Sequence, residues 1–209
     1  MKTLVVAATA AELSGIYDHF QLKPQAFVQG AAFDILITGV GMTATAFALG
    51  QTLNNTYTQV LNLGIAGAFD RQIPLGALVY IHKETFSELG AEDKNAFLTI
   101  DELGFGSSTI EAMPADHPML TGLIKGSGIT VNTVHGHTES IQRIALRLSP
   151  TIESMEGAAV FYAAQQTGIP CIQVRSISNY VEERNKAAWK IGLAIKNLND
   201  WGISFLTNL

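Results

Sequence analysis

Short apolar runs alternate with longer amphipathic segments along the chain, and this alternation predicts strands followed by helices. The runs expected to form strands are Leu4–Ala8, Phe33–Thr38, Gln59–Leu63, Leu78–His82, Ile129–Val134 and Cys171–Ile177. Helices are expected at Met42–Leu53, Thr138–Leu148, Glu156–Thr167 and Glu182–Leu206, where apolar residues recur at helical spacing or glycine and proline follow the segment. This order is typical of an α/β fold with a mostly parallel sheet. In such folds ligands bind at the carboxyl ends of the strands.

One stretch interrupts the alternation. Residues Glu84–Met113 are rich in glycine, serine and acidic side chains. A long connection of this kind is uncommon in a compact domain unless it serves a function. We therefore expect an excursion from the fold, serving as a lid or as an oligomer contact.

Composition and charge narrow the class of protein. The 209 residues, 47% of them hydrophobic, suit one domain spanning residues 1–209. The formal charge of −5 and the lack of a basic run argue against a nucleic-acid partner. No apolar stretch reaches the ~20 residues of a membrane span, and Glu12 follows the short N-terminal run too closely for a signal peptide. We therefore expect a cytoplasmic protein without a membrane partner. Cys171 is the single cysteine, so an intrachain disulfide is excluded.

Three familiar motifs fail on inspection. The turn Gly39–Ala44 fits G-x-G-x-x-A, but the next strand ends without the acidic residue that a dinucleotide site needs. A tight turn packing a helix on a strand explains it better. His135 and His137 point to opposite sides of an extended segment, and no cysteine lies nearby, so no metal site is expected. No G-x-S-x-G pentapeptide is present for a serine hydrolase.

Separated segments resemble one enzyme superfamily. They are Ala10-Ala11-Glu12, the glycine-rich turn Asn62–Gly67, Glu153-Ser154-Met155-Glu156-Gly157-Ala158-Ala159, and Val174-Arg175-Ser176-Ile177-Ser178-Asn179. In order and spacing they resemble methylthioadenosine/S-adenosylhomocysteine nucleosidases and purine nucleoside phosphorylases. The following residues, Asn179–Asn185 and Ala187-Ala188-Trp189, resemble the futalosine hydrolase branch. The resemblance implies a nucleoside phosphorylase-like fold with a central mixed, partly barrel-like sheet flanked by helices. It also implies a homo-oligomer and no metal or organic cofactor.

The resemblance also assigns roles to individual residues. Glu12 becomes the general base for water, with Arg175 as its ionic partner helping to hold that water, and Glu156 accepts hydrogen bonds from the ribose hydroxyls beside Met155. The chemistry calls for the same groups, because hydrolysis needs a carboxylate base and the sugar needs a fixed acceptor. Ala66 and Gly67 belong to the glycine-rich turn, Thr133 and Val134 match the base-stacking segment, and Ser178 precedes the base-binding residue. The structural alternatives are a solvated acid at a helix start for Glu12 and a first-turn helix acid for Glu156.

Asn179 bears on the identity of the purine. The adenine-specific relatives have an aspartate at the matching position. An asparagine amide offers two donors and one acceptor, which suits a 6-oxopurine whose O6 and N7 are both acceptors. The sequence therefore favours hypoxanthine, with a plain turn residue as the alternative. The resemblance then implies hydrolysis of futalosine to hypoxanthine and dehypoxanthine futalosine, a step in an alternative menaquinone route.

The nucleophile is expected to be water. Phosphate is usually held by arginine through bidentate hydrogen bonds. The phosphorylases carry one arginine early in the chain and another just before the glycines of this turn. Here no arginine precedes Arg71, the second of these positions is Asn62, and Ile65 replaces a serine common in the family. Two alternatives remain open: an adenine nucleosidase acting on methylthioadenosine, and a non-catalytic nucleoside-binding protein. The group at the 5′ position is not specified by the sequence.

Overall fold

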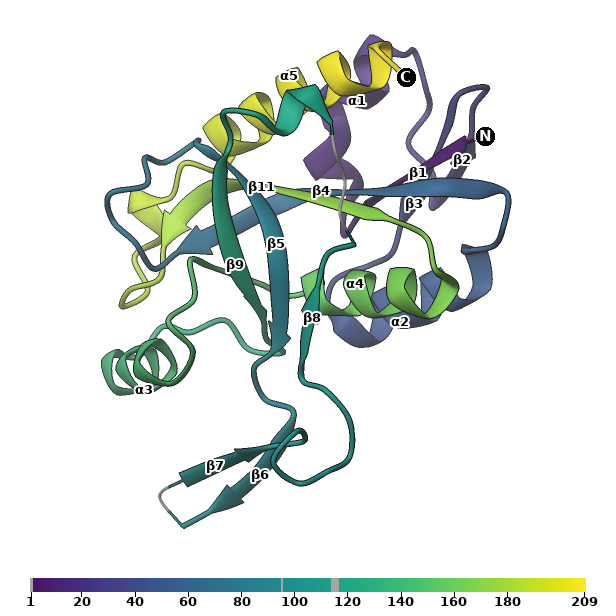
Figure 1. The fold of residues 1–209 in the computed structure, drawn as a ribbon. Helices are drawn as coiled ribbons and strands as arrows, with labels where there is room; N and C mark the ends of the chain where they lie inside the picture. The colour runs from purple at the N-terminus through teal and green to yellow at the C-terminus, as the bar shows by residue number, and fades with distance from the viewer. Residues whose placement is uncertain (1, 95, 114–116) are drawn as a thin grey trace.

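The computed structural model describes residues 2–94, 96–113 and 117–209, in which nine strands form one mixed sheet. The strand order is β10-β9-β5-β11-β4-β1-β3-β2, with β8 paired to β5. Because β10 also pairs with β4, the strands β4, β10, β9, β5 and β11 close into a barrel (Figure 1). The bounds are β1 Lys2–Ala7, β2 Phe27–Gln29, β3 Phe33–Ile37, β4 Tyr57–Ala68, β5 Leu78–Phe86, β8 Thr109–Glu111, β9 Ile124–Thr130, β10 Ile152–Ser154 and β11 Cys171–Tyr180. The expected α/β fold with a partly barrel-like mixed sheet is confirmed.

Helices cover both faces of the sheet. Figure 1 shows α1 (Ser14–His19) and α5 (Ile191–Thr207) on one side, and α2 (Met42–Thr52) and α4 (Gly157–Thr167) on the other. Along β1, Val5 packs with the core beneath α1 and α5, whereas Leu4 and Val6 pack with α2 and α4. A strand buried on both faces needs a continuous apolar run. The helix α3 (Thr138–Leu148) lies beside the barrel, and short 3-10 turns span Ala10–Leu13, Pro118–Leu120 and Lys186–Ala188.

Two predicted elements differ from the structure. The strand expected at Ile129–Val134 is β9, which ends at Thr130, and the residues after it form a loop. In the sequence, Gly126 and Gly128 make the first part of this strand look like a loop. A Cβ at either position would collide with neighbouring side chains. The helix expected from Glu182 begins only at Ile191, because the intervening residues cross the end of β11, where Lys190 N–H donates to Ser178 O at 2.8 Å.

The expected excursion is shorter than predicted. The strand β5 continues to Phe86, so Glu84 is part of the barrel. The segment that leaves the fold contains the hairpin of β6 (Gly90–Asp93) and β7 (Ala96–Thr99), which projects away from the sheet in Figure 1. None of the helices in the described ranges combines the length and the apolar character needed to cross a membrane.

Candidate functional site

A cavity of about 340 Å³ opens at one end of the barrel. Loops that follow β1, β9 and β10 meet there with the ends of β4 and β11. The cavity brings together eight of the ten residues predicted for the site: Glu12, Ala66, Gly67, Val134, Met155, Glu156, Ser178 and Asn179. Arg175 and Thr133 lie outside its wall. A concave site of ~300–1,000 Å³ with a few convergent polar groups is typical of small-molecule binding.

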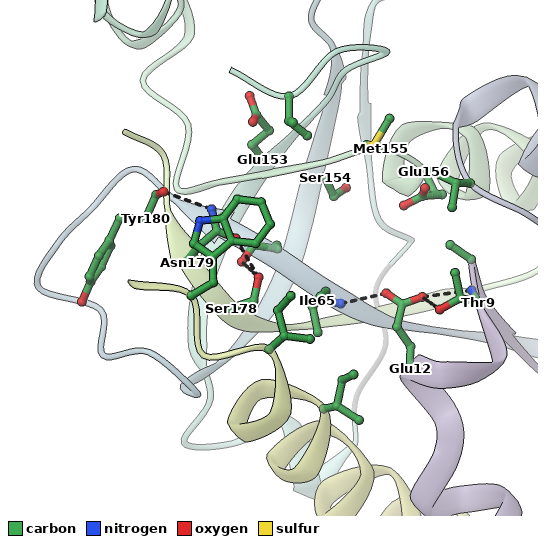
Figure 2. Close-up of a pocket in the computed structure, with 18 of the residues that line it drawn as sticks. Thr9, Glu12, Ile65, Glu153, Ser154, Met155, Glu156, Ser178, Asn179 and Tyr180 are labelled. Carbon is green, nitrogen blue, oxygen red and sulfur yellow. Dashed lines mark hydrogen bonds between the residues drawn. The ribbon is translucent and has the colours of Figure 1, made fainter. Parts of the chain in front are cut away.

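Glu12 is held firmly at the edge of the cavity. It lies in the 3-10 turn that follows β1, and 9% of the residue is exposed. Its Oε2 accepts hydrogen bonds from Thr9 N at 3.0 Å and Thr9 Oγ1 at 2.9 Å, and its Oε1 accepts from Ile65 N at 3.1 Å (Figure 2). Each carboxylate oxygen can accept two hydrogen bonds. The Oε1 atom therefore keeps one acceptor position for a further donor.

Arg175 lies behind the cavity wall, 2% exposed. Its Nη1 would be 2.5 Å from a Cβ placed on Gly64, and Glu12 Oε1 would be 3.0 Å from the same atom, so both groups approach one face of Gly64. The expected ion pair with Glu12 is absent: within the described ranges no carboxylate oxygen is at ion-pair distance from this guanidinium. Its Nη1 instead donates to Asn62 Oδ1 at 3.4 Å. The separation from Glu12 suits one bridging water.

Glu156 occupies the N-cap position of α4 and lines the cavity. Its Oε1 accepts a hydrogen bond from Gly41 N at 2.9 Å. Gly41 has a φ of 94°, a backbone conformation that glycine tolerates best, and this turns its N–H toward the carboxylate. Burial raises the pKa of Glu156, although the Arg175 charge and the Gly41 N–H oppose the rise. The glycine turn after β3 therefore contributes a hydrogen-bond donor to the Glu156 carboxylate.

Asn179 lies on the opposite side of the cavity from the two carboxylates, as Figure 2 shows. A register shift in the pairing of β11 with β4 falls between Ile177 and Asn179. The amide Nδ2 donates to Tyr180 O at 3.0 Å, and Oδ1 accepts from Ser178 Oγ at 2.8 Å. This pairing sets the orientation of the amide and leaves one N–H and one acceptor position of Asn179 for a ligand.

The loop after β9 is attached to β10 by an acid–histidine pair. Glu153 Oε1 accepts from His135 N at 2.9 Å, and Glu153 Oε2 pairs with His135 Nδ1. The pair places Val134 and His135 at the cavity, whereas Thr133 is exposed and outside it. The pattern of the sequence gave no sign of this pair, because its two members are 18 positions apart.

Further cavity residues come from the segment before α5. Glu182, Arg184 and Trp189 line the cavity. The guanidinium carbon of Arg184 lies 5.2 Å from the centroid of the Trp189 ring, within the range of a cation–π contact. The sequence pattern predicted a helix here, so these residues were not among the predicted site residues. Their resemblance to one branch of the family was the available signal.

Comparisons with known proteins agree with this fold and show the family of the chain. The family described as the phosphorylase superfamily matches residues 27–202. A futalosine hydrolase of Streptomyces coelicolor is 35% identical over 181 residues, covering 80% of this chain and 76% of that protein. A futalosine hydrolase of Thermus thermophilus is 31% identical, covering 82% of this chain and 80% of that protein.

Solved structures show the same fold at lower identity. A futalosine hydrolase of Helicobacter pylori superposes with a TM-score of 0.87 at 17% identity, covering 100% of this chain and 98% of that one. A methylthioadenosine/S-adenosylhomocysteine nucleosidase of the same organism also has a TM-score of 0.87 and 17% identity, covering 100% and 99%. Structural likeness alone therefore does not separate these two activities.

Proposed function

Because the chain belongs to the phosphorylase superfamily and, within it, to the futalosine hydrolase family, we propose that it hydrolyses the N-glycosidic bond of futalosine. The products are hypoxanthine and dehypoxanthine futalosine, in the futalosine route to menaquinone. The observation that supports this most directly is the division of the cavity. Two carboxylates, Glu12 and Glu156, lie on one side, and the amide of Asn179 lies on the other.

The acidic side suits the sugar and the attacking water. Glu156 accepts hydrogen bonds from the ribose hydroxyls, with Met155 beside the ring. A water between Glu12 Oε1 and the Arg175 guanidinium attacks C1′ as the bond from C1′ to the purine breaks. The proton of this water passes to Glu12, and the electron pair of the broken bond leaves with the base. A transition state with oxocarbenium character is expected, as in glycoside hydrolysis generally.

The amide side suits a 6-oxopurine. The free N–H of Asn179 donates to the base, next to Ser178, and stabilises the charge that develops on the leaving purine. Val134 supplies an apolar wall, and Ala66 and Gly67 line the cavity close to Asn179. A side chain at position 67 would crowd Asn179, because a Cβ there would lie 3.1 Å from Asn179 Nδ2.

Water is preferred over phosphate for a structural reason. At Asn62, where the phosphorylases have an arginine, both ends of the side-chain amide are already hydrogen-bonded. Its Nδ2 donates to Gln173 Oε1 at 2.7 Å and its Oδ1 accepts from Arg175. Arg71, the first arginine of the chain, pairs with Glu182. Neither residue is arranged to hold a phosphate in the cavity.

The test is an assay of base release in buffer without phosphate. The purified protein is incubated with futalosine, inosine and methylthioadenosine, and the released base is identified by chromatography. Hypoxanthine released from futalosine supports the proposal. Adenine released from methylthioadenosine supports the alternative nucleosidase, and a requirement for phosphate with formation of a sugar 1-phosphate contradicts hydrolysis. We also propose that the chain assembles as a homo-oligomer, which sedimentation tests.

A further inference from the structure

A fully buried carboxylate lies inside the barrel and has no part in the chemistry above. Glu84, on β5, is 0% exposed and does not line the cavity. Its Oε1 accepts from Gln173 Nε2 at 2.5 Å, and its Oε2 accepts from Thr130 Oγ1 at 3.0 Å. A Cβ at Gly128 or Gly157 would collide with this carboxylate. An acid this deeply buried is rare unless it is partnered.

A chain of amide side chains connects Glu84 to Arg175. Gln173 and Arg175 are two positions apart on β11, and Asn62 is paired with Gln173 on the neighbouring β4. Arg175 donates to Asn62 Oδ1, Asn62 Nδ2 donates to Gln173 Oε1, and Gln173 Nε2 donates to Glu84. A guanidinium can only donate and a carboxylate can only accept, so the two charges set the direction of every hydrogen bond between them.

A second contact connects Glu84 to the start of α4. The Thr130 hydroxyl donates to Glu84 and accepts from Ala158 N at 2.7 Å. Ala158 lies in the first turn of α4, two positions after Glu156. The buried carboxylate is therefore connected to both sides of the acidic end of the cavity.

We propose that Glu84 is a positioning residue, which holds the Arg175 guanidinium through Gln173 and Asn62 and holds the start of α4 through Thr130. This proposal rests on the proposed function, because the value of a fixed Arg175 lies in the water that it shares with Glu12. The effect depends on the negative charge of Glu84 at the end of the chain of amide side chains. This charge compensates the buried positive charge of Arg175, which has no direct ion pair among the described residues.

The ionisation of Glu84 is consistent with this role. Burial raises its pKa to about 7, while the Arg175 charge and the donors Gln173 and Thr130 limit the rise and Glu156 adds to it. The Cys171 thiol on β11 also faces it, and burial raises the pKa of that thiol. Protonation of Glu84 near neutral pH would therefore release Arg175, and activity should fall as the pH drops through this range.

The decisive experiment exchanges the two ends of the contact between Glu84 and Gln173. The Glu84→Gln variant removes the charge, and kcat should fall about 10- to 100-fold, as expected for a lost charged hydrogen bond. KM should rise by less. Gln173→Glu alone places two acids together and should also lose activity.

The double variant Glu84→Gln/Gln173→Glu returns one carboxylate to the network. The carboxylate introduced at position 173 can accept from the amide introduced at position 84 and from the Asn62 amide. We expect kcat to return to within about fivefold of wild type. Glu111→Gln, which replaces an exposed carboxylate on β8, is the matched control and should leave kcat unchanged.

The pH profile and thermal unfolding separate positioning from simple packing. The acid limb of kcat should change in Glu84→Gln. An acid whose pKa is higher in the folded protein binds extra protons there, so the contribution of Glu84 to wild-type stability should decrease as the pH rises from about 4.5 to about 7. Glu84→Gln should flatten this dependence and melt no lower than wild type at pH 8. A role in packing alone predicts a lower melting temperature instead.

The outcomes are distinguishable from failure of the proposed function. Wild-type kcat in Glu84→Gln, or no recovery in a folded double variant, overturns the proposal. If the wild-type protein cleaves none of the tested nucleosides, the proposed function fails. The pH dependence of the melting temperature in wild type and Glu84→Gln then tests the role of Glu84 without an activity assay. An unchanged pH dependence in Glu84→Gln would then show that Glu84 is not the charged end of this network.

Discussion

Replacing Asn179 by aspartate tests whether this residue selects the purine. The amide Nδ2 donates to Tyr180 O at 3.0 Å. A carboxylate oxygen in its place would face that carbonyl oxygen as a second acceptor. Toward a 6-oxopurine the conflict is repeated, because O6 and N7 are both acceptors. We expect Asn179→Asp to lose activity on the hypoxanthine nucleoside at neutral pH.

The magnitude follows from the hydrogen bonds that are lost. A polar group left badly paired in a closed site costs ~1–3 kcal/mol. At ~1.4 kcal/mol per tenfold change, the loss in kcat/KM is ~5- to 150-fold. Protonation of the new carboxyl restores a donor, so part of the activity should return as the pH is lowered. The 6-amino analogue of futalosine should be affected less, because its amino group donates to a carboxylate.

The assay compares kcat/KM for futalosine and for its 6-amino analogue in wild type and Asn179→Asp. The ratio of the two values removes any general loss from the altered contact with Tyr180. Asn55→Asp, in an exposed turn, is the control for an added charge. If the ratio is unchanged, Asn179 does not select the base, and the physical argument for hypoxanthine over adenine fails.

Three further predictions concern the acidic side of the cavity. Gly64→Ala should lower kcat, because its Cβ would lie 2.5 Å from Arg175 Nη1 and 3.0 Å from Glu12 Oε1. The control is Gly50→Ala, whose Cβ meets nothing within 4 Å and should leave the kinetics unchanged. Equal rates in the two variants would contradict a water shared by Arg175 and Glu12. Glu12→Gln should still bind hypoxanthine by calorimetry but lose ~10²–10⁴-fold in turnover, and full activity would place the base elsewhere. Glu156→Gln should raise KM and lower kcat, at ~1.5–3 kcal/mol for a charged hydrogen bond. Since burial raises the pKa of Glu156, activity that needs its carboxylate should be lost as the pH falls, in addition to the loss expected from Glu84. The test therefore uses the Glu84→Gln background, where a pH–rate profile that is the same with and without Glu156→Gln would exclude Glu156 as a titrating group.

Local patterns predicted most of the elements because their causes are local. The run Leu4–Ala8 is apolar at every position since β1 is buried on both faces. The end of α4 follows from Gly168, which adopts a φ of 68° after the last helical turn. The residues Glu12, Glu156 and Asn179 could be named as candidates in advance because each lies at the end of a strand or within a few residues after it, and because the family resemblance gives them roles.

Contacts between distant segments could not be derived in this way. The glycines of β9 look like loop residues until Glu84 and Thr151 are seen to occupy the space beside them. The segment 182–190 has a helical composition, yet it crosses the site because its backbone pairs with the end of β11. Arg175 was expected to pair with Glu12, and the amide of Asn62 holds it instead.

The sequence by itself determined the α/β class, the strand ends that carry the polar residues, and the types of group available to a nucleoside. Those features depend on periodicity and on side-chain chemistry, which act within a few residues. Only the tertiary structure decided which strands close the partly barrel-like sheet that the family resemblance implied, that Glu84 belongs inside it, and that its carboxylate is connected to Arg175 through two amides. Such features depend on the register between strands far apart in the chain, where a shift of one residue would turn each side chain to the opposite face.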